Sequence, residues 1–307
     1  MIAFIFPGQG AQAVGMGRDL YERSAAARQA FDVISGACGY SVSGLCFDGP
    51  EELLKQTEYT QPALFATECA ALAACREAGL TPMAVAGHSV GEYAALVAAG
   101  VLTSEAGARL VKARAAAMGH AAQAQSGTMA AILGLDADVV AELCAATPGI
   151  VVPANDNCPG QVVISGETAA VEAVSVRLKE RGAKRVMPLA VSGAFHSPLM
   201  QAAAESLANT LESTTVRAPE IPVVANVTAD YEGTADEIRR NLAAQVAGPV
   251  RWTETIRRLT SDGYTTFIEC GPGSVLAGLV KRIAPEAKTY SVGDMTTLEA
   301  AVNALRT

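Results

Sequence analysis

The sequence predicts an α/β protein in which a largely parallel sheet carries a smaller inserted unit. Three observations support this fold class. Half of the 307 residues are hydrophobic and only 18% are charged, which is enough apolar side chain to bury two cores. Short apolar runs alternate with longer helical stretches in both outer parts of the chain, as in a parallel sheet covered by helices. Between residues 126 and 191 the order of these runs changes.

The outer parts of the chain predict one core domain, formed by residues 1–125 and 192–307. The runs expected to be strands are short and apolar, as buried parallel strands are. The expected strands are 2–6, 83–86 and 266–269. The expected helices are 61–77, 92–99, 105–124, 198–213 and 236–247.

The middle of the chain, residues 126–191, predicts a ferredoxin-like subdomain. Its runs follow the order strand, helix, strand, strand, helix, strand, which is the split β-α-β arrangement. The expected elements are 128–133, 136–146, 150–154, 161–165, 167–181 and 184–189. A cleft between this unit and the core domain is the natural place for a substrate.

Composition excludes several classes of protein. The net charge of −8 and the pI near 5.0 argue against nucleic acid as a partner, because phosphate binding needs a concentrated basic surface. No apolar run has the roughly 18 residues of a membrane span, and the first residues lack the basic start of a signal peptide, so we expect a cytoplasmic protein. Seven cysteines without zinc-ligand spacing predict reduced, packed thiols and no metal site.

The most informative motif is Gly87-His88-Ser89-Val90-Gly91, which lies between a short apolar run and a helical stretch. Two glycines allow a turn tight enough to expose the serine hydroxyl, and the following helix directs free N–H groups toward a bound carbonyl. The arrangement predicts a nucleophile elbow and acyl chemistry through Ser89. The five residues alone are only moderately specific, since a serine between glycines is often a simple turn residue.

The chain has three histidines from which a base for Ser89 can come. His88 adjoins the nucleophile, so we expect its side chain to point away from Ser89 and to serve packing or orientation. His120 falls on the polar face of its helix beside Arg109, which predicts a solvated surface residue. His196 lies in the loop where the inserted unit returns to the core domain, and this position favours it as the base.

Arg114 is an unusual charge on the helix expected at 105–124. At 100° per residue it falls on the apolar stripe formed by Leu110, Val111 and Met118. One interpretation is a structural arginine that reaches the surface or pairs with a buried acid. The other is a fixed receptor for a substrate carboxylate, which a guanidinium binds with two parallel hydrogen bonds.

Several distant segments together resemble the malonyl-CoA:acyl carrier protein transacylase family over essentially the whole chain. The matching segments are 6–12, the elbow 87–91 with Glu92 and Tyr93, Arg114, Asn157 with 159–166, 193–197, 249–252 and 271–276. The resemblance implies an α/β-hydrolase-like core carrying a ferredoxin-like subdomain, in agreement with the order of elements. Ala11 and Val90 depart mildly from the commonest residues of the family, and neither change removes a catalytic group.

The resemblance also implies a role for each matching residue. Ser89 corresponds to the acylated nucleophile, His196 to its general base and Arg114 to the residue that binds the malonyl carboxylate. Gln9 and the backbone N–H of Val90 correspond to the oxyanion hole. Gln245 falls where the family presents the carbonyl that orients the histidine. Phe195 before His196 resembles members that select malonyl groups.

These correspondences imply a ping-pong transfer of malonyl from coenzyme A to the phosphopantetheine thiol of acyl carrier protein, with no metal or redox cofactor. The family is commonly monomeric. Supply of fatty-acid synthesis is the expected purpose, and free-standing service to a polyketide synthase stays open. Hydrolysis of the acyl-enzyme by water is a third interpretation, disfavoured by Arg114. A binding module with a dead site is disfavoured because Ser89, His196 and Gln9 are all present.

Overall fold

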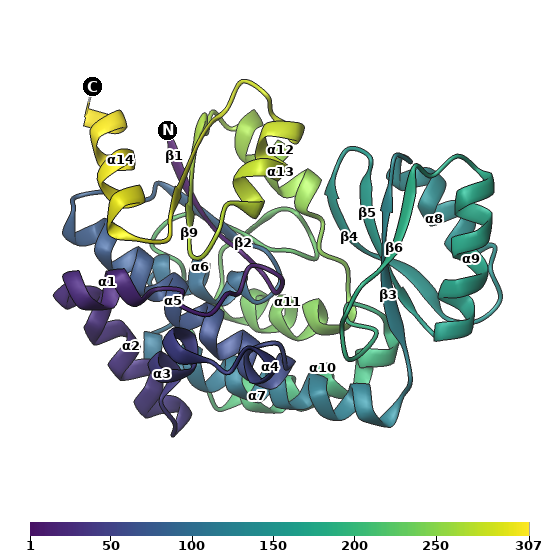
Figure 1. The fold of residues 1–307 in the computed structure, drawn as a ribbon, viewed down its shortest axis with the longest axis horizontal. Coiled ribbons are helices and arrows are strands. Elements are labelled where there is room, and N and C mark those ends of the chain that lie inside the picture. Colours follow the sequence, from purple (N-terminus) through teal and green to yellow (C-terminus); the bar gives the residue numbers. More distant parts are fainter. Residues whose placement is uncertain (307) are drawn as a thin grey trace.

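Across residues 1–306, which the computed structural model describes, the chain is organised around two separate sheets (Figure 1). The larger sheet has the strand order β10-β9-β1-β2-β7-β8. Its neighbouring strands run parallel except β7 and β8, which pair antiparallel. Its strands are β1 (Ile2–Phe6), β2 (Ala84–Gly87), β7 (Val223–Val224), β8 (Tyr231–Glu232), β9 (Thr266–Cys270) and β10 (Lys288–Val292). The expected α/β class with a parallel core sheet is confirmed.

The central strand β1 is buried on both faces, because its side chains alternate between two apolar clusters. Phe4 and Phe6 belong to a cluster with the helices α5 (Thr57–Glu77) and α6 (Gly91–Ala98). Ala3 and Ile5 belong to a second cluster, which is closed by α12 (Trp252–Ser261) and α13 (Val275–Ile283). The sheet is therefore covered by helices on both sides.

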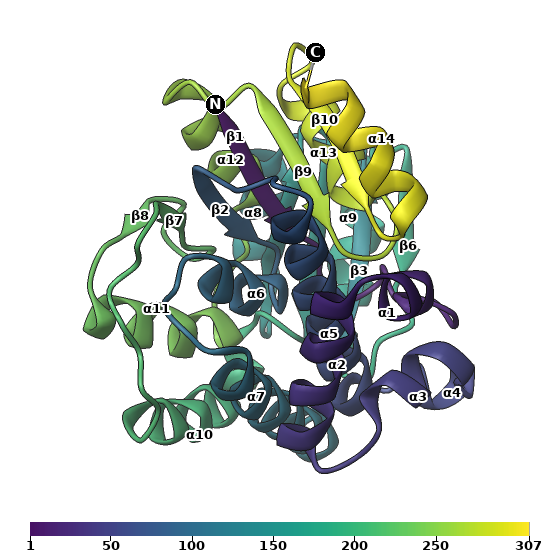
Figure 2. The same ribbon diagram turned by 90° about the vertical axis from the view of Figure 1, so that its left-hand side faces the viewer.

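The remaining helices extend the first of these layers. In Figure 2, α2 packs on α5, α5 on α7, α7 on α10, and α10 on α11. The other helices of the core domain are α1 (Arg18–Arg23), α2 (Ala25–Cys38), α3 (Val42–Asp48), α4 (Glu51–Leu54), α7 (Ser104–Ala124), α10 (Gln201–Glu212), α11 (Ala235–Ala247) and α14 (Met295–Arg306). No single helix within residues 1–306 is long and apolar enough to span a bilayer, although α2 and α3, bent by 115°, pass that test as a pair.

The second sheet confirms the ferredoxin-like subdomain. Its strands are β3 (Thr128–Leu133), β4 (Val151–Cys158), β5 (Gln161–Gly166) and β6 (Arg185–Pro188), in the antiparallel order β4-β5-β3-β6. The helices α8 (Ala137–Ala145) and α9 (Thr168–Glu180) cover the face that points away from the core domain (Figure 1). Ala130 and Ile132 pack under these helices, whereas Met129 and Ala131 belong to the core-domain cluster.

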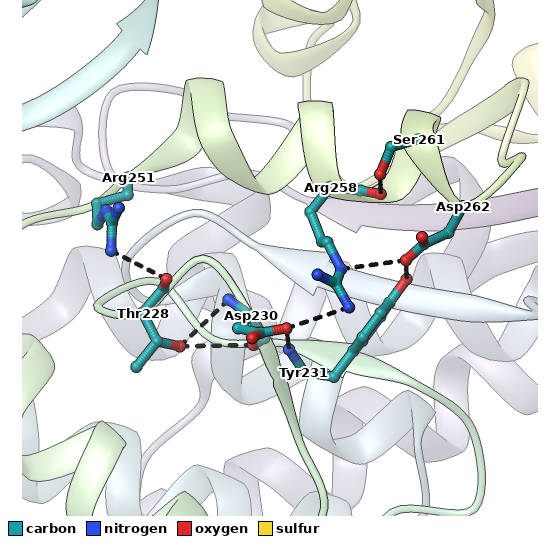
Figure 3. Close-up of polar contacts among 7 residues, drawn as sticks. All are labelled: Thr228, Asp230, Tyr231, Arg251, Arg258, Ser261 and Asp262. Atoms are coloured by element: carbon teal, nitrogen blue, oxygen red, sulfur yellow. Dashed lines mark hydrogen bonds and ion pairs between the residues drawn. The ribbon is translucent and has the colours of Figure 1, made fainter.

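Backbone contacts join the two units along β4. Val250 N–H donates to Ala154 O at 2.8 Å, and Asp156 N–H donates to Val250 O at 3.0 Å. On the core side, a polar network holds the turn after β7 against α12 (Figure 3). In it, Arg251 donates to Thr228 O at 3.0 Å, and Arg258 lies 3.4 Å from Asp230 Oδ1.

The helical boundaries differ from expectation in three places. Residues 18–54 hold four helices, α1 to α4, for which the sequence pattern gave no prediction, as it gave none for α12, α13 and α14. Helix α5 begins at Thr57 rather than at residue 61, with Pro62 inside it, because extensive burial of the helix outweighs the lost hydrogen bond. The helix expected at 198–213 is divided into a 3₁₀ turn at Pro198–Met200 and α10.

Candidate active site

The structure places Ser89 on a tight turn between β2 and α6, as the elbow motif predicted. Ser89 has φ +53°, a left-handed conformation that serine rarely adopts. A Cβ at Gly87 would lie 2.0 Å from the carbonyl carbon of Gly91, and a Cβ at Gly91 would lie 2.2 Å from Phe6 O. Neither position can accept a side chain, so both glycines are required by close backbone packing.

Asn226 holds this turn, and sequence reasoning missed it. Its Oδ1 accepts the Ser89 N–H at 2.7 Å, and its Nδ2 donates to Gly87 O at 2.6 Å. The residue is fully buried directly after β7. The Asn226 carboxamide therefore braces both sides of the strained serine from a strand more than a hundred residues away in the chain.

His196 is brought to the serine hydroxyl. Its Nε2 lies 2.8 Å from Ser89 Oγ, and its Nδ1 lies 2.8 Å from Gln245 O and 3.1 Å from Gly248 O. Two carbonyl acceptors require a proton on Nδ1, which leaves Nε2 free to accept the serine proton. Burial, followed by the charge of Arg114, lowers the pKa of His196 to about 3, so the imidazole is neutral at pH 7.

Arg114 faces the protein interior, as its place on the helix predicted. The residue is 1% exposed. Nη1 donates to Gln61 Oε1 at 2.6 Å, while Nη2 donates to Gln245 Oε1 at 2.8 Å and to Ser89 Oγ at 3.0 Å. No acidic side chain bonds to the guanidinium in the described residues, and Nε has no partner. A buried cation paired only with neutral groups has spare capacity for an anion.

Gln245 contacts Ser89, His196 and Arg114. Beside its backbone bond to His196 and its side-chain bond to Arg114, its Nε2 donates to Ser89 O at 2.9 Å and to Glu92 Oε2 at 2.7 Å. The family resemblance implied a role only for the backbone carbonyl of Gln245. Burial, followed by the nearby Glu232, raises the pKa of Glu92 to about 8.

Gln9 and Val90 both line the cavity beside Ser89. Val90 precedes the first residue of α6, where backbone N–H groups have no intrahelical acceptor. The backbone N–H groups of Gln9 and Val90 have no hydrogen-bond acceptor among residues 1–306. The Gln9 side chain is held by Thr57 Oγ1 at 3.3 Å.

The other two histidines lie as expected. His88 has Nε2 2.9 Å from Asn157 Oδ1 and its ring edge-on to Trp252, and it also lines the cavity beside Ser89. His120 is exposed on α7. The packing interpretation of His88 and the surface interpretation of His120 are confirmed.

A cavity of about 330 Å³ lies between the core domain and the subdomain. Ser89, His196, Arg114, Gln9, Val90 and Phe195 all line it. Its apolar side chains include Met118, Met129, Met187 and Leu189. No group of three potential metal ligands occurs in the described part of the chain. A hydroxyl bonded to a neutral imidazole, beside free N–H groups and a buried cation, is suited to transfer of an anionic acyl group.

A family model for the acyl transferase domain matches residues 3–301. The chain belongs to this acyl transferase family. The "Malonyl CoA-acyl carrier protein transacylase" of Bacillus subtilis (strain 168) is 46% identical, covering 99% of this chain and 97% of the relative. The corresponding Haemophilus influenzae protein is 45% identical, covering 97% of each. The resemblance found in the motifs is therefore confirmed over the whole chain.

Solved acyl transferase structures show the same fold. The malonyl-CoA:acyl carrier protein transacylase of Xanthomonas oryzae pv. oryzae superposes with a TM-score of 0.95 at 44% identity, covering 99% of this chain and 98% of that one. A malonyl-transacylase in complex with a type II polyketide synthase acyl-carrier protein gives 0.95 at 42% identity, covering 99% of each chain.

Proposed function

We propose that this acyl transferase moves the malonyl group of malonyl-CoA to the phosphopantetheine thiol of acyl carrier protein, in the cytoplasm and for fatty-acid synthesis. The single observation that carries the proposal is the position of Ser89 Oγ, 2.8 Å from His196 Nε2 and 3.0 Å from Arg114 Nη2. One atom thus adjoins both a base and a receptor for a carboxylate. The names of the curated relatives support the same substrates.

In the first half-reaction Ser89 takes the acyl group. His196 Nε2 accepts the hydroxyl proton as Oγ attacks the thioester carbon, and the oxyanion receives hydrogen bonds from the N–H groups of Gln9 and Val90. When the intermediate collapses, the carbon–sulfur bond breaks and the proton on His196 passes to the departing sulfur of coenzyme A. A malonyl ester of Ser89 remains.

The second half-reaction reverses these steps with a different thiol. The phosphopantetheine thiol of the carrier gives its proton to His196 and attacks the ester carbon. The proton then returns to Ser89 Oγ as the ester bond breaks, which gives ping-pong kinetics. The carbonyls of Gln245 and Gly248 take the place of the carboxylate that orients the histidine in many serine enzymes. The groups named supply each proton transfer, and the proposed reaction uses no cofactor.

Arg114 supplies the preference for a carboxylated acyl group. Its Nη2 already uses both N–H bonds, one on Gln245 and one on Ser89, whereas Nη1 uses one, on Gln61. Bidentate binding of a malonyl carboxylate therefore employs the free N–H of Nη1 and the N–H of Nη2 that Ser89 holds in the free protein. Phe195, 5% exposed in the cavity wall, limits the space beside the acyl group.

We propose that the domain division runs as the sequence indicated, with residues 1–125 and 192–307 as the catalytic core, residues 126–191 as the subdomain, and a monomer as the working unit. A basic rim patch, consisting of Lys184, Arg185, Lys281 and Arg282, would dock the acidic carrier. All four residues are exposed. Arg282 donates to Pro159 O at 2.8 Å, and Gly134 N–H donates to Gly160 O at 2.8 Å, which brings the loops of the patch together.

Intact-mass spectrometry tests this function directly. Mixing the protein with malonyl-CoA should add one malonyl group, and holo carrier protein should then remove it to its own thiol. Ser89→Ala should abolish the mass shift, with Ser104→Ala as a matched control on a helix N-terminus elsewhere. Release of the group only to water would favour the hydrolase interpretation, and a shift that survives Ser89→Ala would overturn the role of Ser89.

A further inference from the structure

Glu92 is a fully buried carboxyl group whose hydrogen bonds lead to two residues that hold the catalytic groups in place. It lies in the first turn of α6 and is 0% exposed. Its Oε2 accepts the side-chain N–H of Gln245 at 2.7 Å and the backbone N–H of Asn226 at 3.2 Å. An acid in the first turn of a helix commonly stabilises that helix, but neither of these two bonds returns to α6.

Gln245 joins Glu92 to Arg114 through a single carboxamide. The Oε1 of this carboxamide accepts Arg114 Nη2 at 2.8 Å, and its Nε2 donates to Glu92 Oε2 and to Ser89 O. A guanidinium can only donate, so Oε1 has to face Arg114 and Nε2 has to face away from it. Because Glu92 takes one of the two N–H groups of Nε2, it helps to fix the direction in which Oε1 meets Arg114.

Gln245 needs an acceptor oxygen on Glu92 rather than a negative charge. Burial, followed by the nearby Glu232, raises the pKa of Glu92 to about 8, so the neutral acid predominates at pH 7. Both donors reach Oε2, whereas Oε1 has no partner among residues 1–306, as expected when Oε2 is the carbonyl oxygen of a neutral acid. A neutral Glu92 also leaves the charge of Arg114 uncompensated.

We propose that Glu92 is a positioning residue whose Oε2 holds the Gln245 carboxamide in the orientation that presents Arg114 to the carboxylate of the acyl group. This inference rests on the proposed function, in which Arg114 binds that carboxylate. The other bond of Glu92 holds Asn226, which braces Ser89, and Ser89 serves every acyl group alike. Loss of Glu92 should therefore lower the preference for malonyl over acetyl, beyond any general slowing of transfer.

The test measures the ratio of malonyl to acetyl loading of Ser89, each from its coenzyme A thioester. Glu92→Leu removes the acceptor, and the loss of one hydrogen bond corresponds to about 3- to 10-fold, so the ratio should fall by that factor. Glu92→Gln keeps an acceptor oxygen without an ionisable group and should preserve the ratio. Added to Arg114→Ala, Glu92→Leu should lower the ratio no further, because it acts through Arg114.

Glu68→Leu is the matched control. Glu68 is also a fully buried glutamate on a core helix, α5, and both of its carboxyl oxygens are unpaired in the described part of the chain. Its replacement removes no hydrogen bond of Gln245, so the ratio should stay unchanged whatever happens to the melting temperature. Equal loss of malonyl and acetyl loading in Glu92→Leu, or a ratio in Glu92→Gln as low as in Glu92→Leu, overturns the positioning role.

A measurement on the Gln245 side chain separates this inference from the proposed function. Hydrogen exchange of its Nε2 protons, followed by NMR, needs no substrate and should be slow in the unchanged protein and in Glu92→Gln. In Glu92→Leu it should be about 3- to 10-fold faster. Fast exchange in the unchanged protein overturns the inference even where Glu92→Leu does not fold. Failure to form malonyl-Ser89 overturns the proposed function instead, and the exchange rates still decide the role of Glu92.

Discussion

Replacement of Arg114 by alanine tests the residue on which the choice of acyl group depends. The change removes the two N–H groups that a malonyl carboxylate would engage, and it also releases Ser89 Oγ from Nη2. An acetyl group has no carboxylate and makes neither of the two bonds. Malonyl loading should therefore fall far more than acetyl loading.

The expected size of the effect follows from the two bonds. Hydrogen bonds to a charged group contribute about 1.5–3 kcal/mol each, so a bidentate pair contributes about 3–6 kcal/mol. This range corresponds to a loss of roughly 10²–10⁴-fold in malonyl transfer. The fold should survive, because the change removes a buried charge, although Gln61 and Gln245 each lose a donor.

Single-turnover loading of Ser89 by malonyl-CoA and by acetyl-CoA, followed by intact mass, measures both rates in one assay. Arg114→Met is the control for packing, since it keeps an unbranched stem in place of the arginine stem but lacks the guanidinium and its charge. Melting temperatures of both variants report on folding. Equal loss of malonyl and acetyl loading in folded protein, or unfolding of both variants, would show that Arg114 is structural and would remove the main physical support for malonyl.

Three further predictions concern the elbow, the base and the rim. Asn226→Ala should lower kcat for Ser89 acylation by up to roughly 10²-fold with little change in KM for malonyl-CoA; a change in KM alone would contradict its positioning role. The folded-state pKa of His196, about 3, lies below its ordinary value of 6.5. Between these two values His196 is protonated in the unfolded chain and neutral in the folded protein. Stability should therefore fall as the pH drops below 6.5, by about 2 kcal/mol at pH 5, and the difference in melting temperature between the protein and His196→Gln should show this dependence; parallel pH profiles would refute it. Charge reversal across the basic rim patch should raise KM for carrier protein while malonyl loading from coenzyme A persists; unchanged carrier kinetics would reject the patch.

The parts of the site that sequence predicted are those with a local pattern. Ser89 is framed by glycines between a strand and a helix, and Arg114 interrupts an apolar stripe at helical spacing. Both signals come from residues close together in the chain, where backbone geometry fixes the relation between neighbours. The order of strands and helices predicted the subdomain for the same reason.

The residues that sequence reasoning missed act across long chain separations. Asn226 follows a two-residue strand and reaches Ser89 only because β7 pairs beside β2. The side chain of Gln245 is one polar group on an ordinary amphipathic helix, and its three partners, Arg114, Ser89 and Glu92, come from outside that helix. Helices α1, α3 and α4 are too short for a period of 3.6 residues to stand out, whereas α2 buries residues 27, 31, 34 and 38 at that period and sequence reasoning overlooked it. Pairing of distant segments decides these contacts, and a single sequence carries little record of it.

The left-handed backbone at Ser89, described above, recurs at His196, where φ is +58°. Within residues 1–306 only one other non-glycine residue, Ala229, has a positive φ. Each such residue costs about 1–3 kcal/mol of folding free energy, and the rest of the fold must offset that loss. Selection for thermal stability alone would favour glycine at both positions and would erase the nucleophile and its base together. The most stable sequence for this backbone and the most active one are therefore different sequences, and engineering for heat resistance has to leave these two positions untouched.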